Sequence, residues 1–295
     1  MFKRIILFIA TNILVMVTIS ILLNILGVGH YIEESGLNYQ SLMIFCLVWG
    51  MGGAFISLAL SRVMAKWMMK VQVIDPNGAS QYSWLVQMVS QQCRAAQLAV
   101  VPEVGVYDSP EVNAFATGPT KSRALVALST GLIDRMSRNE VEGVVAHELA
   151  HIKNGDMVTM TLIQGVMNAF VMFFARVISF AISQNVREES RSMVRILVTI
   201  VLDICLSILG SILVAWFSRQ REYRADAGSA VIAGREKMIA ALEALKRFSG
   251  QVDPEAQHAS LATMKISSGT KRGFMALLGT HPSLDDRIAR LRNFA

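Results

Sequence analysis

The sequence predicts a mainly α-helical integral membrane protein, in which transmembrane helices are combined with an α+β domain that has a small sheet. Of its 295 residues, 53% are hydrophobic and only 17% are charged, which is more apolar than a soluble domain of this length. Four hydrophobic segments approach or reach the length that crosses a bilayer. Two short apolar runs, 104–107 and 124–128, are typical of strands.

The first hydrophobic segment, residues 5–28, is interpreted as a retained membrane anchor. Lys3 and Arg4 precede it, as in a signal peptide. However, its apolar stretch exceeds the roughly 7–15 residues of a signal peptide, and no A-x-A cleavage site follows. At about 1.5 Å per residue, the segment is long enough for a hydrocarbon core of roughly 30 Å.

A second segment, residues 42–61, is expected to form a transmembrane hairpin with the first. The connecting loop, 29–41, contains acidic residues but no Lys or Arg. Basic residues follow the second segment instead: Arg62, Lys66 and Lys70. Because cytoplasmic flanks carry an excess of Lys and Arg, both ends of this hairpin are predicted to lie in the cytoplasm.

The third and fourth segments, 157–182 and 193–217, each contain one charged residue, Arg176 and Asp203 respectively. Isolated charges in lipid are costly, so two alternatives stay open: a second spanning hairpin, or two helices that enter the bilayer only partly. The two charges could mark an ion path or form a structural pair. Three arginines after the fourth segment are expected on the cytoplasmic side: Arg219, Arg221 and Arg224.

The chain is therefore expected to have four parts. Residues 1–66 form the first hairpin, 67–156 the first part of a non-membrane domain, 157–217 the second hydrophobic pair, and 218–295 the rest of that domain. Each non-membrane part is small, which favours one domain assembled from both.

Composition also limits the partners and the metal chemistry. The net charge is +6, but charges are few and no basic run occurs, so a lipid bilayer is expected as a partner and nucleic acid is not. The three cysteines, Cys46, Cys93 and Cys205, are far apart and show no CxxC spacing. Neither a disulfide framework nor a thiolate zinc site is predicted.

Residues 137–157 predict an amphipathic helix with defined ends. Ser137 followed by Glu140 is a capping box that starts the helix at Arg138, and Gly155 is a good stop. Apolar residues recur at helical spacing and give the helix one buried face: Val141, Val144, Val145, Leu149 and Ile152.

This helix contains an HExxH motif, formed by His147, Glu148 and His151. Residues four apart lie one turn apart on the same helix face, so both imidazoles can reach one metal ion. Neutral imidazole is a good zinc ligand, and Glu148 is placed to act as a general base. The alternative is a helix with two structural histidines. It is weak because imidazoles without partners would be poorly solvated beside the apolar face.

A catalytic zinc also needs a third protein ligand. Glu222 and Asp226 are four residues apart and share a helix face, so Glu222 could ligate while Asp226 accepts a hydrogen bond from a ligating histidine. Equally, both acids could pair with neighbouring arginines on a solvated helix. The remaining histidines, His30, His258 and His281, stay open as ligands.

These motifs together resemble the HtpX family of bacterial membrane zinc metalloproteases, relatives of the CAAX prenyl proteases. The resemblance covers nearly the whole chain and includes HELAHIKNGDMVTMTLIQG, SRQREYRADAGSA, GREKMIAALEALK and THPSLDDRI. It implies a gluzincin-like zinc protease domain with one Zn²⁺ per chain. It also implies that Glu222 is the third ligand and that Asp226 supports a zinc-binding histidine.

The resemblance implies further site residues. The stretch NAFATG resembles the family's substrate-binding edge strand, although the residues alone favour an ordinary hairpin strand: Asn113, Ala114, Phe115, Ala116 and Thr117. His281 and Arg287 match an H-P-x-x-x-x-R pattern whose members flank the metal, where either could stabilise the oxyanion. Alternatively, His281 caps a helix, and Arg287 packs the last helix while bridging Asp285 or Asp286 on the surface.

The implied activity is that of a zinc endopeptidase of the bacterial inner membrane, with its protease domain facing the cytoplasm. The HExxH motif lies just before the third hydrophobic segment, so membrane proteins or unfolded polypeptides are the expected substrates. The implied role is quality control of damaged or misfolded membrane proteins. One rival is a site-two-type intramembrane protease, which the charged flanks of the motif disfavour. Another is a non-enzymatic transporter with a structural zinc, which would need four protein ligands.

Overall fold

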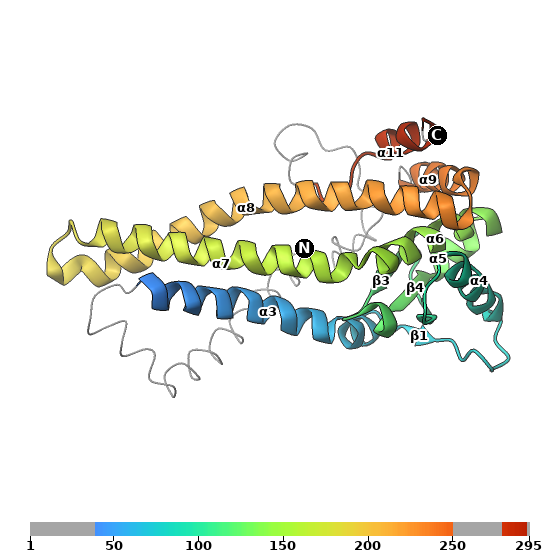
Figure 1. Cartoon of the computed structure of the whole chain (residues 1–295), viewed down its shortest axis with the longest axis horizontal. Coiled ribbons are helices and arrows are strands. Elements are labelled where there is room, and N and C mark those ends of the chain that lie inside the picture. The colour runs from blue at the N-terminus through green and yellow to red at the C-terminus, as the bar shows by residue number, and fades with distance from the viewer. Residues whose placement is uncertain (1–38, 250–278, 294–295) are drawn as a thin grey trace. The chain divides into compact units, whose positions relative to one another are not determined.

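The computed structural model describes residues 39–249 and 279–293 (Figure 1). The predicted first membrane segment, 5–28, lies outside the described residues. The chain divides into two compact units. One unit comprises the described part of Met1–Ser57 together with Thr161–Val214, and the other comprises Leu58–Met160 together with the described part of Ala215–Ala295.

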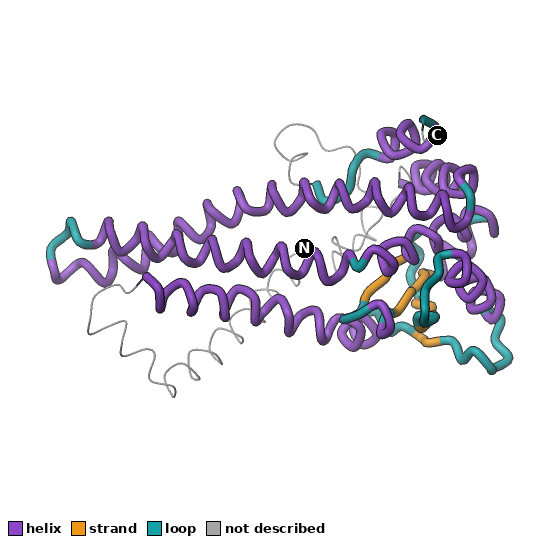
Figure 2. The backbone as a smooth tube through the Cα atoms, viewed as in Figure 1, coloured by secondary structure: helices purple, strands orange, loops and turns teal. Residues whose placement is uncertain are grey.

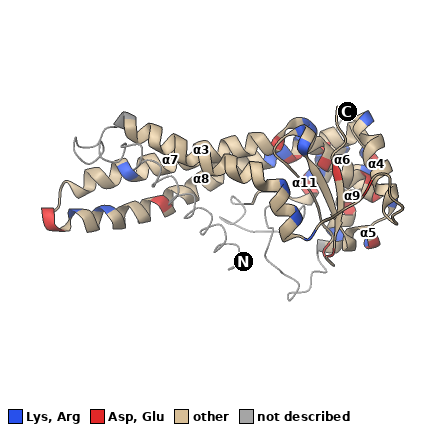
Figure 3. Cartoon of the chain, turned by 90° about the horizontal axis from the view of Figure 1, so that it is seen from below, with Lys and Arg blue, Asp and Glu red and all other residues tan. Residues whose placement is uncertain are grey.

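The first unit is built from parts of three long helices: α3 (Tyr39–Met68), α7 (Asp156–Ser183) and α8 (Glu188–Ala233). Within the described chain, these are the helices that are long and apolar enough to cross a membrane. They contain the predicted segments 42–61, 157–182 and 193–217, which are thereby confirmed as helical. Figure 3 shows that charged residues are few along their apolar stretches.

Small and hydroxyl side chains join the helices of this unit. A Cβ on Gly50 of α3 would lie 2.5 Å from the backbone nitrogen of Ala169 in α7, so the two backbones approach closely. Between α7 and α8, the Thr199 hydroxyl donates to Ser179 Oγ at 2.8 Å. These contacts are typical of membrane helices, which associate through close packing and interhelical hydrogen bonds.

The two charged residues within the apolar segments, Arg176 and Asp203, do not form a direct ion pair. Arg176 donates to the Met172 carbonyl on its own helix at 3.0 Å. The Asp203 Oδ1 atom is buried without a hydrogen-bond partner among the described residues. A direct ion pair between Arg176 and Asp203, one of the alternatives from sequence, is therefore not formed within the described chain.

Helix α8 is much longer than the apolar segment that predicts it. It runs for 46 residues, so the polar stretch with Glu222 and Asp226 continues the same helix without a break. The helix ends before Gly234, whose φ of 101° suits glycine. The change in hydropathy near residue 217 thus marks the end of the apolar surface and not the end of the helix.

The second unit contains a four-stranded sheet in the order β1-β2-β4-β3. The strands are β1 (Gln72–Val73), β2 (Glu103–Tyr107), β3 (Ala114–Thr117) and β4 (Leu125–Ser129), drawn in orange in Figure 2. Strands β2 and β4 are parallel, whereas β1–β2 and β3–β4 are antiparallel. The two predicted strands are confirmed, and the NAFATG stretch forms β3 at the sheet edge.

Helices α4 (Ser83–Ala95) and α6 (Arg138–Asn154) cover one face of this sheet. Helix α9 (Arg235–Ser249) packs on α6, and α11 (Leu284–Arg292) packs on α9. Alternate strand residues, such as Val104, Val106, Val126 and Leu128, enter the core that these helices share. The intervening residues enter a smaller cluster on the opposite face: Tyr107, Phe115, Leu125 and Ala127, with Ala65 of α3.

Two short elements flank β4: a 3-10 turn (Lys121–Arg123) precedes this strand, and α5 (Thr130–Arg135) follows it. Helices α6 and α9 pack closely, because a Cβ on Gly143 of α6 would lie 2.4 Å from the Lys237 carbonyl oxygen. The Lys237 ammonium also contacts the Glu142 carboxylate. Helix α6 is therefore held between β3 and α9, which fixes the helix that carries HExxH.

Candidate metal centre

The ends of α6 are set by the residues that predict them. The Ser137 hydroxyl accepts from the Glu140 amide, and the Glu140 carboxylate accepts from the Ser137 amide, which completes the capping box. Gly155 adopts φ 72° at the C-cap. The predicted helix from Arg138 to the residue before Gly155 is confirmed.

Helix α6 places its two histidines side by side. Their Nε2 atoms are 3.0 Å apart, and the rings lie nearly perpendicular at 84°. His147 is 1% exposed and His151 is 9% exposed, so both rings belong to the interior. The one-turn spacing therefore brings two nitrogen donors to one point, as the motif predicts.

Helix α8 supplies a carboxylate to the same point. Glu222 Oε2 lies 3.4 Å from His147 Nε2, and Oε1 lies 3.4 Å from His151 Nε2. Arg221 contacts Glu222 Oε1 at 3.0 Å, but Glu222 itself is 1% exposed and Asp226 is 3% exposed. The alternative of a solvated charged helix is therefore wrong.

The three donors fit a metal ion. One ligand atom from each of His147, His151 and Glu222 lies within 4.8 Å of the others, and all three residues are buried. Glu222 Oε2 is buried without a well-aligned hydrogen bond to a described residue, although nitrogens of His147, His281 and Arg287 lie 3.1–3.6 Å from it, which suits an oxygen that faces a cation. Burial alone would raise the pKa of Glu222, but the charges of His151 and His281 lower it well below its ordinary value.

His151 is oriented by an acid that sequence reasoning missed. Its Nδ1 lies 2.6 Å from Asp156 Oδ2, and Asp156 is buried. A proton on Nδ1 that is donated to this carboxylate leaves Nε2 free as a ligand. Burial alone would lower the pKa of His151, but Glu222 and Asp156 outweigh it and raise the pKa to about 9. The available signal was the position of Asp156 directly after the Gly155 cap.

His147 is oriented by Asp226, at 3.0 Å between Nδ1 and Oδ1. Asp226 in turn accepts from Arg287, whose Nε and Nη2 lie 2.8 and 2.6 Å from its two oxygens. Arg287 is fully buried. Burial alone would raise the pKa of Asp226, but the guanidinium outweighs it and holds the pKa at about 2.

The surface bridge considered for Arg287 is wrong. Asp285 pairs with Lys246, and Asp286 accepts from Ser283. Arg287 is instead buried next to the candidate metal ligands, with Nη1 3.6 Å from Glu222 Oε2. Two of its three nitrogens are used to fix Asp226, which favours a role in holding the site together.

His281 enters the site from the chain segment before α11. Its Nδ1 lies 3.1 Å from Glu222 Oε2, and its side chain is nearly buried. Its Nε2 has no hydrogen-bond partner in the described part of the chain. The N-cap of α11 is Ser283, so the alternative that His281 caps this helix is wrong.

Glu148 stands next to the histidines with its carboxylate uncommitted. The residue is 5% exposed. Glu148 forms no hydrogen bond or ion pair with any residue that the structure describes, that is, 39–249 and 279–293. A carboxylate in this position is available to a water molecule, as a general base must be.

Strand β3 is an edge strand of the sheet and packs beside α6. The Asn113 carbonyl accepts from the Ser129 amide at 2.9 Å, so Asn113 directs its backbone toward β4. Backbone groups alternate sides along an antiparallel strand. Ala114 and Ala116 therefore direct their N–H and C=O groups away from β4, whereas Phe115 and Thr117 bond to it.

The fold and this buried set of two histidines and a glutamate define a membrane metalloprotease. The sequence model of peptidase family M48 matches residues 79–295, and the chain belongs to that family. The chain is 49% identical over 294 residues to Protease HtpX of Thioalkalivibrio sulfidiphilus, which covers 98% of both chains. It is 50% identical over 299 residues to a Protease HtpX homolog of Bacillus subtilis, which covers 99% of both.

A solved structure has a similar fold. The crystal structure of S. mikatae Ste24p aligns with a TM-score of 0.64 and 16% identity, and the match covers 99% of this chain and 67% of that one. The predicted resemblance to the HtpX family is confirmed, and a non-enzymatic transporter is ruled out by the family. Helix α6 packs against β3 and α9 in the second unit, which argues against a site-two arrangement, where HExxH lies inside a spanning helix.

Proposed function

We propose that this protein is a zinc endopeptidase of the bacterial inner membrane, which cleaves misfolded or damaged membrane proteins on the cytoplasmic side. The convergence of His147, His151 and Glu222 beside an unpaired Glu148 supports this proposal most strongly. Three protein ligands leave a fourth position for water or substrate, which is typical of catalytic rather than structural zinc.

The residues of the site have separate tasks in this mechanism. Zinc, when bound, polarises the scissile carbonyl and lowers the pKa of a water molecule. Glu148 takes a proton from the attacking water and passes it to the leaving amine. We assign the oxyanion donor to His281, because its Nε2 is free whereas Arg287 uses Nε and Nη2 to hold Asp226.

The substrate backbone is proposed to add to β3 as a further strand. The outward N–H and C=O groups of Ala114 and Ala116 supply the hydrogen bonds, as in other edge-strand recognition. Proline at 116 removes one outward N–H without breaking the β3–β4 ladder. Ala116→Pro should therefore raise KM by roughly 2–10-fold, the value of one hydrogen bond.

Ala116→Ser is the matched control for this test, since it keeps the amide. Steady-state cleavage of a labelled peptide by both variants measures the effect. An unchanged KM in Ala116→Pro would exclude Ala116 from substrate binding.

The cytoplasmic location is supported by charge. Basic residues follow the apolar stretch of α3, at Arg62, Lys66 and Lys70, and that of α8, at Arg219, Arg221 and Arg224. Helix α6 ends one residue before α7, a candidate span, begins. The active site then lies near the cytoplasmic headgroups, within reach of membrane-protein substrates.

Reporter fusions test this orientation. A reporter after residue 75 should be cytoplasmic, and one inserted after residue 186, between α7 and α8, should be periplasmic. The reverse pattern would place the protease domain outside the cytoplasm and overturn the substrate class.

Purified full-length protein in detergent tests the activity. We expect one zinc per chain, cleavage of casein, loss of cleavage on chelation, and recovery with zinc. A destabilised membrane protein should be cut faster than its folded parent. Cleavage that persists after complete chelation would overturn the metal mechanism, and equal rates for the two membrane substrates would overturn the quality-control role.

A further inference from the structure

A pocket of about 200 Å³ lies between α8 and α11, on the outer side of the residues that support the metal centre. Helix α8 contributes Gln220, Tyr223 and Arg224 to its walls, and α11 contributes Arg290. The buried pair of Asp226 and Arg287 also lines it.

The charges around this pocket are unbalanced. Asp226 and Arg287 neutralise each other. Arg224 and Arg290 are exposed, and neither makes an ion pair with a residue that the structure describes. The Arg290 guanidinium carbon lies over the Tyr223 ring, 4.4 Å from its centre, so one of the two cations is held in place. The pocket therefore presents two arginines without an ion-pair partner among the described residues. A further acid close by is Asp286, and burial together with the charge of this acid raises the pKa of Tyr223.

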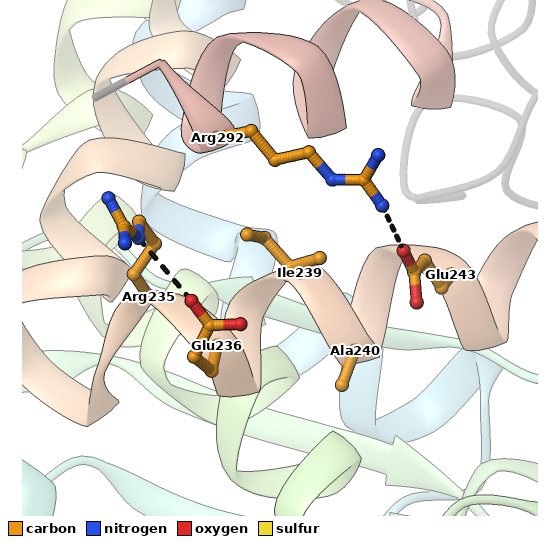
Figure 4. A pocket seen from close by; sticks show the side chains of 6 residues that line it. All are labelled: Arg235, Glu236, Ile239, Ala240, Glu243 and Arg292. Carbon is orange, nitrogen blue, oxygen red and sulfur yellow. Dashed lines mark hydrogen bonds and ion pairs between the residues drawn. The ribbon is translucent and has the colours of Figure 1, made fainter.

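A hollow between α9 and α11 provides a contrast (Figure 4). Its volume is about 290 Å³, and it also contains two arginines. There Arg292 pairs with Glu243 at 2.8 Å, and Arg235 lies 3.5 Å from Glu236. In this hollow each arginine lies beside a carboxylate, so the presence of two arginines does not by itself make an anion-binding pocket.

The position of the first pocket along α8 suits a lipid headgroup. Trp216, next to the end of the apolar stretch of α8, is 48% exposed, and tryptophan favours the membrane interface. Tyr223 follows seven residues later, so it lies on nearly the same helix face, about 10 Å farther along the axis. Gln220 is about 6 Å beyond Trp216. A headgroup layer extends roughly 5–8 Å beyond the hydrocarbon core. Gln220 therefore lies in the outer part of this layer, whereas Tyr223 and Arg224 start just beyond it, and long helical side chains that point back toward the helix N-terminus can reach a headgroup phosphate from there.

We propose that this pocket binds a phosphate ester group between Arg224 and Arg290. Guanidinium groups match phosphate oxygens in a bidentate geometry, and the Tyr223 hydroxyl can add a hydrogen bond. The phosphate belongs either to an anionic phospholipid or to a soluble molecule. The proposal does not depend on the protein's proteolytic substrates.

Calorimetric titration of full-length protein in dodecyl maltoside tests the proposal with three probes. Dioctanoyl phosphatidylglycerol carries both chains and phosphate, dioctanoylglycerol carries chains alone, and sodium phosphate carries phosphate alone. Titrations into protein-free micelles are subtracted. We expect phosphatidylglycerol to bind with one site per chain. Arg224→Gln and Arg290→Gln should each weaken this binding about tenfold or more, because each removes a charge-assisted contact.

Arg292→Gln is the matched control, since it removes an exposed charge from the same helix as Arg290 and should bind like wild type. Binding of phosphatidylglycerol alone, lost in the first two variants, assigns the site to a lipid headgroup. Binding of sodium phosphate with the same variant dependence assigns it to soluble phosphates. The proposal is overturned by equal binding of dioctanoylglycerol, by wild-type binding in Arg224→Gln and Arg290→Gln, by an equal loss in Arg292→Gln, or by no binding of any probe.

Discussion

The two histidines of α6 are supported in different ways. His151 is oriented by Asp156, five residues later in the chain, through one contact of 2.6 Å. His147 is oriented by Asp226 on α8, which is itself fixed by Arg287 on α11. One support is local and consists of a single pair. The other joins three helices that are far apart in sequence.

This difference distinguishes a contact that only orients a metal-binding ring from a network that also holds the domain's helices together. The local pair can fix the ring of His151 without affecting how the domain packs. The long-range chain buries two full charges, and a buried charge that loses its partner is strongly destabilising. We therefore expect the His147 support to contribute to both metal binding and folding, and the His151 support to contribute mainly to metal binding.

The largest effect is expected for Arg287→Leu. It leaves Asp226 charged and buried without its guanidinium, which should cost about 3–5 kcal/mol of stability and should weaken metal binding as well. Thermal unfolding and metal content of the detergent-solubilised full chain measure both effects. Arg292→Leu breaks an exposed pair with Glu243 and should cost about 1 kcal/mol or less. Equal losses in the two variants would remove the distinction between a buried and a surface pair.

A smaller and more selective effect is expected for Asp156→Ala. Loss of an outer partner of a ligating histidine typically weakens metal affinity about 10–100-fold. At about pH 9 and above, where protonated His151 no longer contributes to stability, the metal-free variant should unfold at nearly the wild-type temperature, because Asp156 is not part of the arginine-linked chain. Competition with a zinc chelator measures the affinity. If the variant binds zinc like wild type, or fails to fold, the claim that Asp156 contributes mainly to metal binding is wrong.

The smallest effect concerns pH, and it distinguishes the two supports without mutation. In the metal-free protein the pKa of His151 is raised to about 9, so the stabilisation from its protonated form is complete below about pH 6.5 and is lost as pH rises through 9. The pKa of Asp226 is lowered to about 2, so its contribution is constant over that window. The melting temperature of the chelated protein should fall between pH 6.5 and 9. Asp156→Ala should flatten the decline, and a fall that is just as steep in this variant would exclude the His151–Asp156 pair as its source.

Sequence alone predicted those parts of the site that depend on local geometry. The capping box and Gly155 fixed both ends of α6, and the spacing of HExxH placed the two imidazoles together. Glu222 needed the family resemblance, because spacing on one helix cannot show which distant helix it meets. The same limit hid the partner of Arg287, which is 61 residues away in sequence.

Two features were missed for other reasons. The charged residues that flank the motif include Asp156, and nothing in the spacing singled it out as the partner of His151, although it directly follows the Gly155 cap. The length of α8 was missed because hydropathy reports which surface is apolar and not where the helix ends. Glu222 and Asp226 therefore stand on a continuation of a candidate membrane span.

The central claim is that Glu148 acts as the general base beside a metal held by His147, His151 and Glu222. The most direct test is the zinc content and peptide cleavage rate of Glu148→Gln compared with wild type. We expect one zinc per chain in both proteins and a loss of about 10²–10⁴ in kcat for the variant, because the ligands remain while the base is removed. Turnover within tenfold of wild type, or a variant that no longer binds zinc, would contradict the claim.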